Sequence, residues 1–194
     1  MQQDAASKLR FSAQRTMRTA QNLYEGIDIG GETVGLITYM RTDSLHLADE
    51  AITEIRGLIE QRYGKDNLPE QIAVYKSKSK NAQEAHEAIR PTSVLHTPED
   101  IKDKLTPDQF ALYQLIWRRT MACQMIHATL NNVSVQLGCG KGNTFRASGS
   151  TVKKPGFMSV HMDNNGEIAN DSKTNKLLPE LTEGEKINLL EIRS

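Results

Sequence analysis

A tyrosine and an arginine in the segment LITYMRT, residues 36–42, have the chemistry to act together on a phosphate group. The segment is short and rich in β-branched residues, so an extended backbone would project Tyr39 and Arg41 to the same side. A phenol is a poor nucleophile at neutral pH, but a nearby guanidinium favours the phenolate and offers a planar fork of donors to a phosphate. The pair suits attack on a phosphodiester. A half-buried strand tyrosine beside a solvated arginine is the alternative interpretation.

A second set of polar side chains lies in the segment AQEAHEAIR, residues 82–90. Its composition predicts a helix that ends before Pro91, because the residue before a proline is disfavoured in the α region. On such a helix Gln83, His86 and Arg90 would share one face and could grip a phosphate. An ordinary polar helix face is the alternative. A metal site is not expected, since no second histidine stands at ligand spacing.

Several basic residues could neutralise backbone phosphates without reading bases, or could simply be solvated. They are Lys76, Lys78 and Lys80 before the predicted helix, and Arg10, Arg15 and Arg18 near the N-terminus. The set Asp43, Ser44 and His46 is too crowded for a catalytic triad, and Asp and Ser are common capping residues before a helix. The glycine-rich loop 26–35 lacks the lysine of a phosphate-binding P-loop.

Helical periodicity and capping residues predict the elements that position these side chains. Apolar residues at steps of three or four predict one helix over residues 4–24, ended by Gly26, and another from about Leu47 to a C-cap at Gly64. The sequences Thr97-Pro98-Glu99 and Thr106-Pro107-Asp108 each supply a threonine N-cap, a proline at the first helical position and an acid in the first turn. The second of these helices is predicted to reach about Met125.

From His127 onward the pattern becomes strand-like. Residues 128–139 alternate apolar and polar side chains, and three more β-type runs follow at 145–152, 157–162 and 186–194, separated by turn sequences. We therefore predict an α+β protein, with a mostly helical part over residues 1–125 and a β-rich segment over residues 126–194.

Composition narrows the class of protein. The chain has 194 residues, with 24 Lys plus Arg balanced by 24 Asp plus Glu, which excludes a globally basic nucleic-acid binder but leaves a local basic patch possible. Two cysteines without CxxC pairing are too few for a structural zinc site or a disulfide scaffold. No apolar run reaches the ~20 residues of a membrane span, and the N-terminus lacks the apolar stretch of a signal peptide. We expect a cytosolic protein.

The combination of LITYMRTDS with NAQEAHEAIRPT about forty residues later resembles the core of the bacterial type IA DNA topoisomerases. The segments KLRFSAQRTMRTAQNLYEG and QLIWRRTMACQM resemble the same family and stand in the right order. The resemblance covers the whole chain and is strongest over residues 5–125.

The resemblance implies roles for individual residues. Tyr39 matches the nucleophile, Arg41 the arginine that holds the scissile phosphate, and His86 a histidine near the cleavage site. Further positions that match the DNA-binding lining of the site are Gln21, Glu25, Thr42, Asp43 and Arg90. The sequence departs from the family pattern at Arg10, where many relatives have a small residue, and we count Arg10 among the DNA-binding candidates.

The resemblance also implies what lies outside this sequence. The helical part would be the movable domain that carries the tyrosine, and the β-rich segment would be half of the arch domain, whose other half precedes residue 1. The acidic magnesium cluster and the catalytic lysine would lie in a separate domain, so this chain would hold no metal and would be a fragment that depends on the rest of its polypeptide.

The implied activity is relaxation of negatively supercoiled DNA without ATP, through cleavage of a single-stranded region and a 5′-phosphotyrosine. The implied location is the cytoplasm, in association with the nucleoid, and the fragment alone would be inactive. A tyrosine recombinase is disfavoured, because it would place its arginines and histidine before a C-terminal tyrosine. A non-catalytic helical nucleic-acid-binding module remains the alternative.

Overall fold

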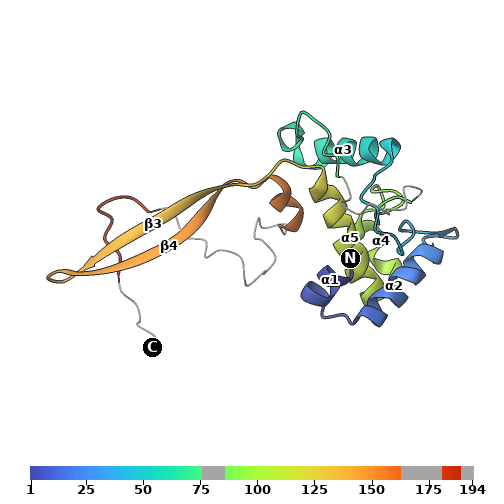
Figure 1. The fold of residues 1–194 in the computed structure, drawn as a ribbon, viewed down its shortest axis with the longest axis horizontal. Coiled ribbons are helices and arrows are strands. Elements are labelled where there is room, and N and C mark those ends of the chain that lie inside the picture. Colours follow the sequence, from blue (N-terminus) through green and yellow to red (C-terminus); the bar gives the residue numbers. More distant parts are fainter. Residues whose placement is uncertain (76–85, 163–180, 189–194) are drawn as a thin grey trace. The chain divides into compact units, whose positions relative to one another are not determined.

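The computed structural model describes residues 1–75, 86–162 and 181–188. The chain divides into two compact units. Of the described residues, one unit contains Met1–His127 and 156–162, and the other contains Ala128–Pro155 and 181–188. The first unit is mostly helical and the second is a β-hairpin, which confirms the predicted α+β class (Figure 1).

The N-terminal helix predicted over residues 4–24 is interrupted. The structure has α1 (Gln2–Asp4), a π-helical turn η1 (Ala5–Leu9) and then α2 (Ala13–Glu25). Arg10 adopts a left-handed conformation with φ 59°, and the Ser12 hydroxyl caps α2 by accepting from the Arg15 N–H at 3.2 Å. The prediction of one continuous helix was wrong because Ser12 starts a new helix, while the turn at Arg10 allows Phe11 to be buried.

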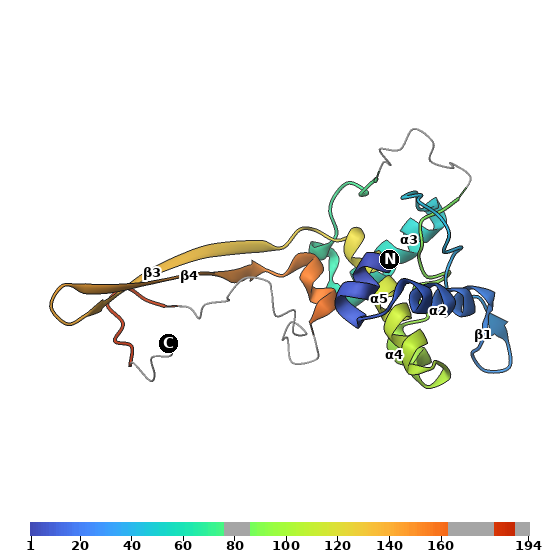
Figure 2. The same cartoon turned by 60° about the horizontal axis from the view of Figure 1, so that its bottom comes forward.

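A small hairpin and a long helix follow α2. Residues 26–35, predicted as a loop, contain β1 (Ile27–Asp28) and β2 (Thr33–Val34), which pair antiparallel (Figure 2). Helix α3 (Asp49–Tyr63) buries an apolar stripe and ends at Gly64 with φ 87°, as predicted. The single turn η2 (Lys65–Asn67) comes next.

The two helix starts predicted from threonine-proline sequences are confirmed. Thr97 caps α4 (Pro98–Ile101), which is followed by η3 (Lys102–Lys104). Thr106 caps α5 (Pro107–Cys123), and its side chain and that of Gln109 form a reciprocal capping box. Helix α5 ends at Cys123, slightly before the predicted end.

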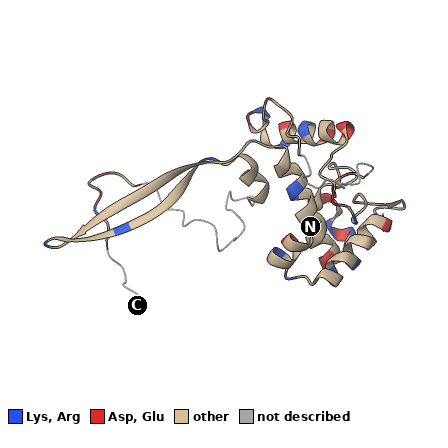
Figure 3. Cartoon of the chain, in the orientation of Figure 1, with Lys and Arg blue, Asp and Glu red and all other residues tan. Residues whose placement is uncertain are grey.

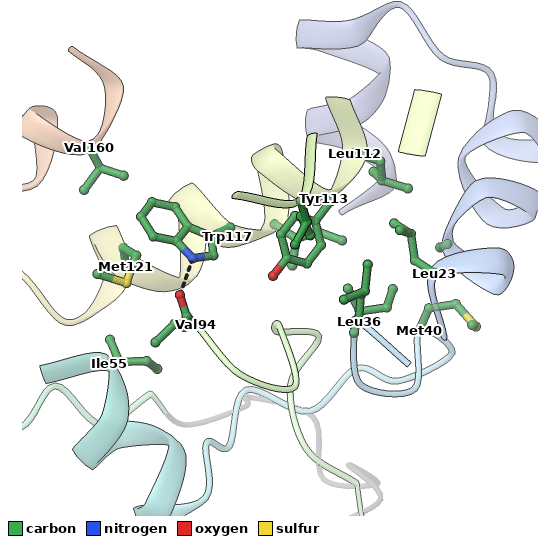
Figure 4. Close-up of a cluster of buried hydrophobic side chains, with 14 of the residues drawn as sticks. Leu23, Leu36, Met40, Ile55, Val94, Leu112, Tyr113, Trp117, Met121 and Val160 are labelled. Carbon is green, nitrogen blue, oxygen red and sulfur yellow. Dashed lines mark hydrogen bonds between the residues drawn. The ribbon is translucent and has the colours of Figure 1, made fainter. Parts of the chain in front are cut away.

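The core of the helical unit forms around α5. Tyr113, Trp117 and Met121 from this helix meet side chains from α2, α3 and the segment after β2, as the labelled residues show (Figure 4). Trp117 Nε1 donates to the Val94 carbonyl at 2.9 Å, and the Tyr113 hydroxyl donates to the His96 carbonyl at 2.6 Å. These bonds satisfy the polar atoms of two large buried rings and fix the chain that leads into α4.

The β-hairpin unit consists of β3 (Thr129–Cys139) and β4 (Asn143–Lys154), antiparallel from Thr129↔Lys154 to Cys139↔Asn143. The first two predicted β-runs are therefore confirmed. The prediction of a strand at 157–162 was wrong, because Gly156–His161 forms the 3₁₀ helix η4. Residues 186–188 of the last predicted run are not in a strand, and the rest of that run lies outside the described residues.

Charges of both signs are distributed over the helices of the first unit (Figure 3). The hairpin differs, since β3 carries no charged residue and β4 carries three positive ones, Arg146, Lys153 and Lys154. The lysines Lys76, Lys78 and Lys80 of the predicted phosphate-contacting stretch lie outside the described residues.

Candidate active site

Tyr39 lies in an irregular extended segment whose apolar side chains anchor it in the core. Leu36, Ile37 and Met40 are buried, whereas Tyr39 is 38% exposed and Arg41 is exposed. The alternation of Tyr39, Met40 and Arg41 agrees with the prediction that the tyrosine and the arginine project away from the core together. Burial of Met40 therefore presents both polar side chains to solvent.

The segment around Tyr39 is held against residues 86–92. The Thr38 N–H donates to the Arg90 carbonyl at 2.9 Å, and the Thr92 N–H donates to the Leu36 carbonyl at 3.0 Å. The Thr38 hydroxyl donates to the Ala88 carbonyl at 2.7 Å and accepts from the Arg90 N–H at 3.0 Å. One side chain thus completes the pairing of two segments that are far apart in the sequence.

The predicted helix over residues 82–90 was wrong for its described part. Residues 86–90 are not helical. Their backbone N–H groups bond elsewhere, with Ala88 donating to the His46 carbonyl at 2.8 Å and Arg90 to the Thr38 hydroxyl. The shared helix face expected for Gln83, His86 and Arg90 therefore does not form, and Gln83 lies outside the described residues.

His86 nevertheless lies beside Tyr39. The ring centroids are 5.7 Å apart and the ring planes are inclined by 38°. A second ring, that of Tyr24, contacts Tyr39 edge-on, with centroids 5.5 Å apart and planes inclined by 64°. An extended backbone brings His86 next to Tyr39, whereas the prediction had placed His86 on a helix.

Arg90 has a set of partners within its own segment. Its guanidinium donates to both carboxylate oxygens of Glu87, at 2.7 and 3.3 Å, and to the carbonyls of Pro91 and Thr92. The side chain of Arg90 is 13% exposed. The Glu87 carboxylate also accepts from the Ala48 N–H at 2.7 Å, just before α3. In this arrangement Arg90 supports the backbone that carries His86, and four of its five N–H donors are engaged.

Arg41 is different, because it has no hydrogen-bond or ion-pair partner among the described residues. Thr42 follows it and accepts from the Ser44 N–H at 3.0 Å, while the Ser44 hydroxyl accepts from the His46 N–H at 3.2 Å. Asp43 is exposed between them. Within the part of the chain that the structure describes, Arg41 is thus an exposed guanidinium without a bonding partner, two residues from Tyr39.

A hollow of about 480 Å³ lies next to this turn. Its lining includes Thr42, Asp43 and Tyr75, together with Arg119 and Cys123 of α5. Burial raises the pKa of the Tyr75 phenol, whose hydroxyl donates to the Cys123 carbonyl at 2.7 Å, and burial raises the pKa of the Cys123 thiol to about 11. Cys123 is therefore a protonated, packed thiol and not a nucleophile at neutral pH.

The remaining predicted residues lie on or near α2. Gln21 donates to Glu25 at 2.7 Å, one turn apart on the exposed surface, and Glu25 is the last residue of this helix, next to Tyr24. Arg10 is exposed at the break before α2, and no contact joins it to Tyr39 among the described residues. Of the basic residues expected on the first helix, Arg15 is neutralised by Asp108 through two short hydrogen bonds, at 2.6 and 2.7 Å.

Sequence reasoning missed three residues of this site. Tyr24 falls in the apolar stripe that predicts the helix over residues 4–24, but 41% of its surface is exposed and its ring contacts Tyr39. Thr38 and Glu87 were not singled out, although they hold the two segments together. Nothing local identified the partners of Thr38 and Glu87.

Within residues 1–75, 86–162 and 181–188, no group of three or more histidine, cysteine, aspartate or glutamate side chains could hold a metal ion. In the same part of the chain, no helix has the length and apolarity to cross a membrane.

Comparison with known proteins identifies the family. A family model described as DNA topoisomerase matches residues 1–194. The chain is 50% identical over 193 residues to DNA topoisomerase 1 of Rickettsia felis, covering 99% of this chain and 25% of that protein. It is 47% identical over 194 residues to DNA topoisomerase 1 of Helicobacter pylori, covering 100% of this chain and 25% of that protein.

A solved structure is also similar. Full-length topoisomerase I from Thermotoga maritima matches with a TM-score of 0.64 and 36% identity, over 90% of this chain and 28% of that one. The chain spans about a quarter of the length of the curated relatives it matches. The resemblance inferred from the two motifs is confirmed: the chain belongs to the bacterial DNA topoisomerase family.

Proposed function

We propose that this chain supplies the nucleophile and part of the phosphate-binding surface of a type IA DNA topoisomerase, as one part of a longer polypeptide. The observation that carries the proposal is the cluster in which Tyr39 lies exposed beside His86, with the exposed guanidinium of Arg41, which has no partner among the described residues, two residues away. Residues 1–125 act as the domain that carries the tyrosine, and residues 126–194 act as half of the arch domain.

The reaction begins when the phenolate oxygen of Tyr39 attacks the phosphorus of a phosphodiester in a single-stranded region of negatively supercoiled DNA. A bond forms between the phenolic oxygen and the 5′-phosphoryl group, and the bond to the 3′ oxygen breaks. The 3′ oxygen leaves as a hydroxyl after it takes up a proton, and the phenol has lost one, so protons balance. One phosphodiester replaces another, so the reverse attack by the 3′-hydroxyl reseals the strand without ATP.

Arg41 and His86 assist this exchange from two directions. The exposed guanidinium of Arg41 binds the non-bridging oxygens of the phosphate, where charge builds up as Tyr39 attacks. His86 lies close enough to the Tyr39 ring to bind the same phosphate or to move a proton at its edge. Thr42, Asp43, Gln21 and Glu25 line the approach, and Arg90 contributes by holding the His86 segment.

The family resemblance implies magnesium in the longer polypeptide. The described residues of this chain do not fit a magnesium site, since no cluster of three or more suitable ligands occurs among them. No step above passes through a metal. We place the magnesium ligands in the remainder of the polypeptide, and we place its action on nucleoid DNA in the cytoplasm.

The test is a chimaera in which this chain replaces the matching segment of the Rickettsia felis relative. The chimaera should relax a negatively supercoiled plasmid and form a covalent adduct with a 3′-labelled single-stranded oligonucleotide, because the fragment that stays bonded to Tyr39 through its 5′-phosphoryl group carries the 3′ end. Tyr39→Phe should abolish the adduct and leave oligonucleotide binding intact, because only the reacting oxygen is removed. Tyr63→Phe makes the same chemical change on α3, outside the site, and serves as the matched control.

Two outcomes would contradict the proposal. An adduct that persists in Tyr39→Phe would show that another residue is the nucleophile. Oligonucleotide binding without any adduct, in a chimaera whose parent protein is active, would favour the non-catalytic nucleic-acid-binding module. We also expect no relaxation by the 194-residue chain alone, and relaxation by that purified chain would show that the site is complete within it.

A further inference from the structure

The ring of Tyr24 is the least expected neighbour of Tyr39. Tyr24 comes from the last turn of α2, and its ring meets that of Tyr39 edge-on, with centroids 5.5 Å apart. This is the arrangement that the charge distribution of aromatic rings favours. With His86 also in contact, the exposed ring of Tyr39 is flanked by two rings from different segments of the chain.

The backbone fixes the position of Tyr24 relative to Tyr39. The Leu36 N–H donates to the Leu23 carbonyl at 2.7 Å, which ties the last turn of α2 to the segment of the nucleophile. Gly35 makes this approach possible, because a Cβ atom built on it would lie 2.6 Å from the Tyr24 carbonyl oxygen. A contact that short with a backbone atom forces the two segments apart, so the spacing depends on a glycine here.

The exposed ring of Tyr39 needs such support. Its segment is not part of a regular helix or sheet, and exposed side chains change rotamer on the picosecond to nanosecond timescale. Attack on a phosphorus requires the phenolic oxygen to be in line with the bond that breaks, so a ring that samples several rotamers reacts more slowly. Packing against Tyr24 removes rotamers without touching the hydroxyl.

We propose that Tyr24 is a positioning residue for the nucleophile, and that Gly35 sets the distance at which it acts. This inference rests on the proposed function, in which Tyr39 attacks the phosphodiester. Tyr24 acts through its ring and not through its hydroxyl, for which the described residues provide no hydrogen-bond partner. The role therefore calls for an aromatic side chain at position 24, not for a phenol.

The first test compares Tyr24→Leu and Tyr24→Phe in the Rickettsia felis chimaera. Tyr24→Leu should slow single-turnover adduct formation by roughly 10- to 100-fold, the range expected when a reacting group is displaced by about 1 Å. The dissociation constant for a single-stranded oligonucleotide should not change, and Tyr24→Phe should restore the rate. Equal losses in Tyr24→Leu and Tyr24→Phe would overturn the inference, because the hydroxyl would then carry the effect.

The second test uses Gly35→Ala, with Gly57→Ala as the matched control. A Cβ on Gly57 in α3 meets nothing within 4 Å, so this substitution adds the same methyl group without displacing anything. Gly35→Ala should slow adduct formation as Tyr24→Leu does. In the 194-residue chain it should also move the aromatic proton resonances of Tyr39 by altering the ring-current shift from Tyr24, and Gly57→Ala should do neither.

The outcomes separate this inference from the proposed function. If Tyr39→Phe is inactive while Tyr24→Leu forms adduct at the normal rate, the positioning role of Tyr24 is overturned and the nucleophile stands. If Tyr39→Phe still forms adduct, the proposed function itself fails. Unshifted Tyr39 resonances in a folded Gly35→Ala chain would show that Gly35 does not set the spacing.

Discussion

Replacement of Thr38 by valine removes one hydroxyl and leaves the shape of the side chain nearly unchanged. That hydroxyl donates to the Ala88 carbonyl at 2.7 Å and accepts from the Arg90 N–H at 3.0 Å. Thr38→Val therefore leaves one backbone acceptor and one backbone donor without these partners. The main-chain bond from the Thr38 N–H to the Arg90 carbonyl is kept.

The expected cost follows from the burial of these groups. An unsatisfied buried donor or acceptor costs about 1–3 kcal/mol, and both groups here are only partly buried, so water compensates in part. We expect Thr38→Val to lower the free energy of unfolding by about 2 kcal/mol, which corresponds to roughly 4–8 °C in Tm. Thr38→Ser keeps the hydroxyl and should recover most of the loss.

Urea denaturation followed by far-UV circular dichroism measures the effect. The midpoint should fall in Thr38→Val with an unchanged m-value, since the surface exposed on unfolding is the same. A loss below about 0.5 kcal/mol, which is typical of a neutral surface change, would refute the reasoning. Equal losses in Thr38→Val and Thr38→Ser would also refute it, because the effect would then come from packing and not from the two hydrogen bonds.

Three further predictions concern other parts of the chain. Gly57→Ala should raise the free energy of unfolding by roughly 0.5–1 kcal/mol in urea denaturation, because Gly57 lies inside α3 with open space where the methyl group would go. Hydrogen bonds from Arg15 lower the pKa of the Asp108 carboxyl in the folded protein. The ionised carboxylate therefore adds to the free energy of unfolding above the unfolded-state pKa of about 3.9, and this contribution is lost as pH falls through the lower folded-state pKa. Asp108→Asn should therefore reduce the fall in the free energy of unfolding at acidic pH, and an unchanged fall would contradict this prediction. At pH 8, mass spectrometry should find Cys139 alkylated by iodoacetamide well before Cys123, since burial raises the pKa of Cys123 to about 11 and leaves roughly 0.1% of it as thiolate.

The elements that the sequence predicted well are those whose signals are local. Thr97 and Thr106 each cap a helix through a hydrogen bond to a residue three positions later, so the capping pattern contains all the information needed. The C-terminal end of α3 at Gly64 is equally local. The hairpin of β3 and β4 follows from alternation on either side of a glycine-containing turn.

The errors occurred where distant residues determine the backbone. Residues 86–90 have helix-forming composition, yet their N–H groups bond to Thr38 and His46 in other segments, and no periodicity within the segment reveals those partners. Residues 157–162 were predicted as a short β-type run, but Gly156–His161 forms a 3₁₀ helix in which Val160 joins the core of the helical unit. In both cases tertiary contacts overrode local preference.

In the candidate site, too, local sequence signals predicted some of the contacts, and contacts between distant segments determine the rest. Tyr39 and Arg41 could be paired from the sequence because their spacing alone sets their common direction. The contact between Tyr39 and His86 could be anticipated only through the family resemblance, since the helix expected to present His86 does not form. The ring of Tyr24 could not be placed, because its position depends on the close approach of Gly35 to α2.

The single tryptophan of the chain provides a spectroscopic label for one unit alone. Trp117 is 2% exposed, donates to the Val94 carbonyl and lies with its ring 5.4 Å from the Arg62 guanidinium, all within the helical unit. Its fluorescence emission therefore responds to loss of that core, while the hairpin of β3 and β4 contributes no indole signal. Emission and circular dichroism recorded on the same sample will separate the melting of the two units without any label or substitution.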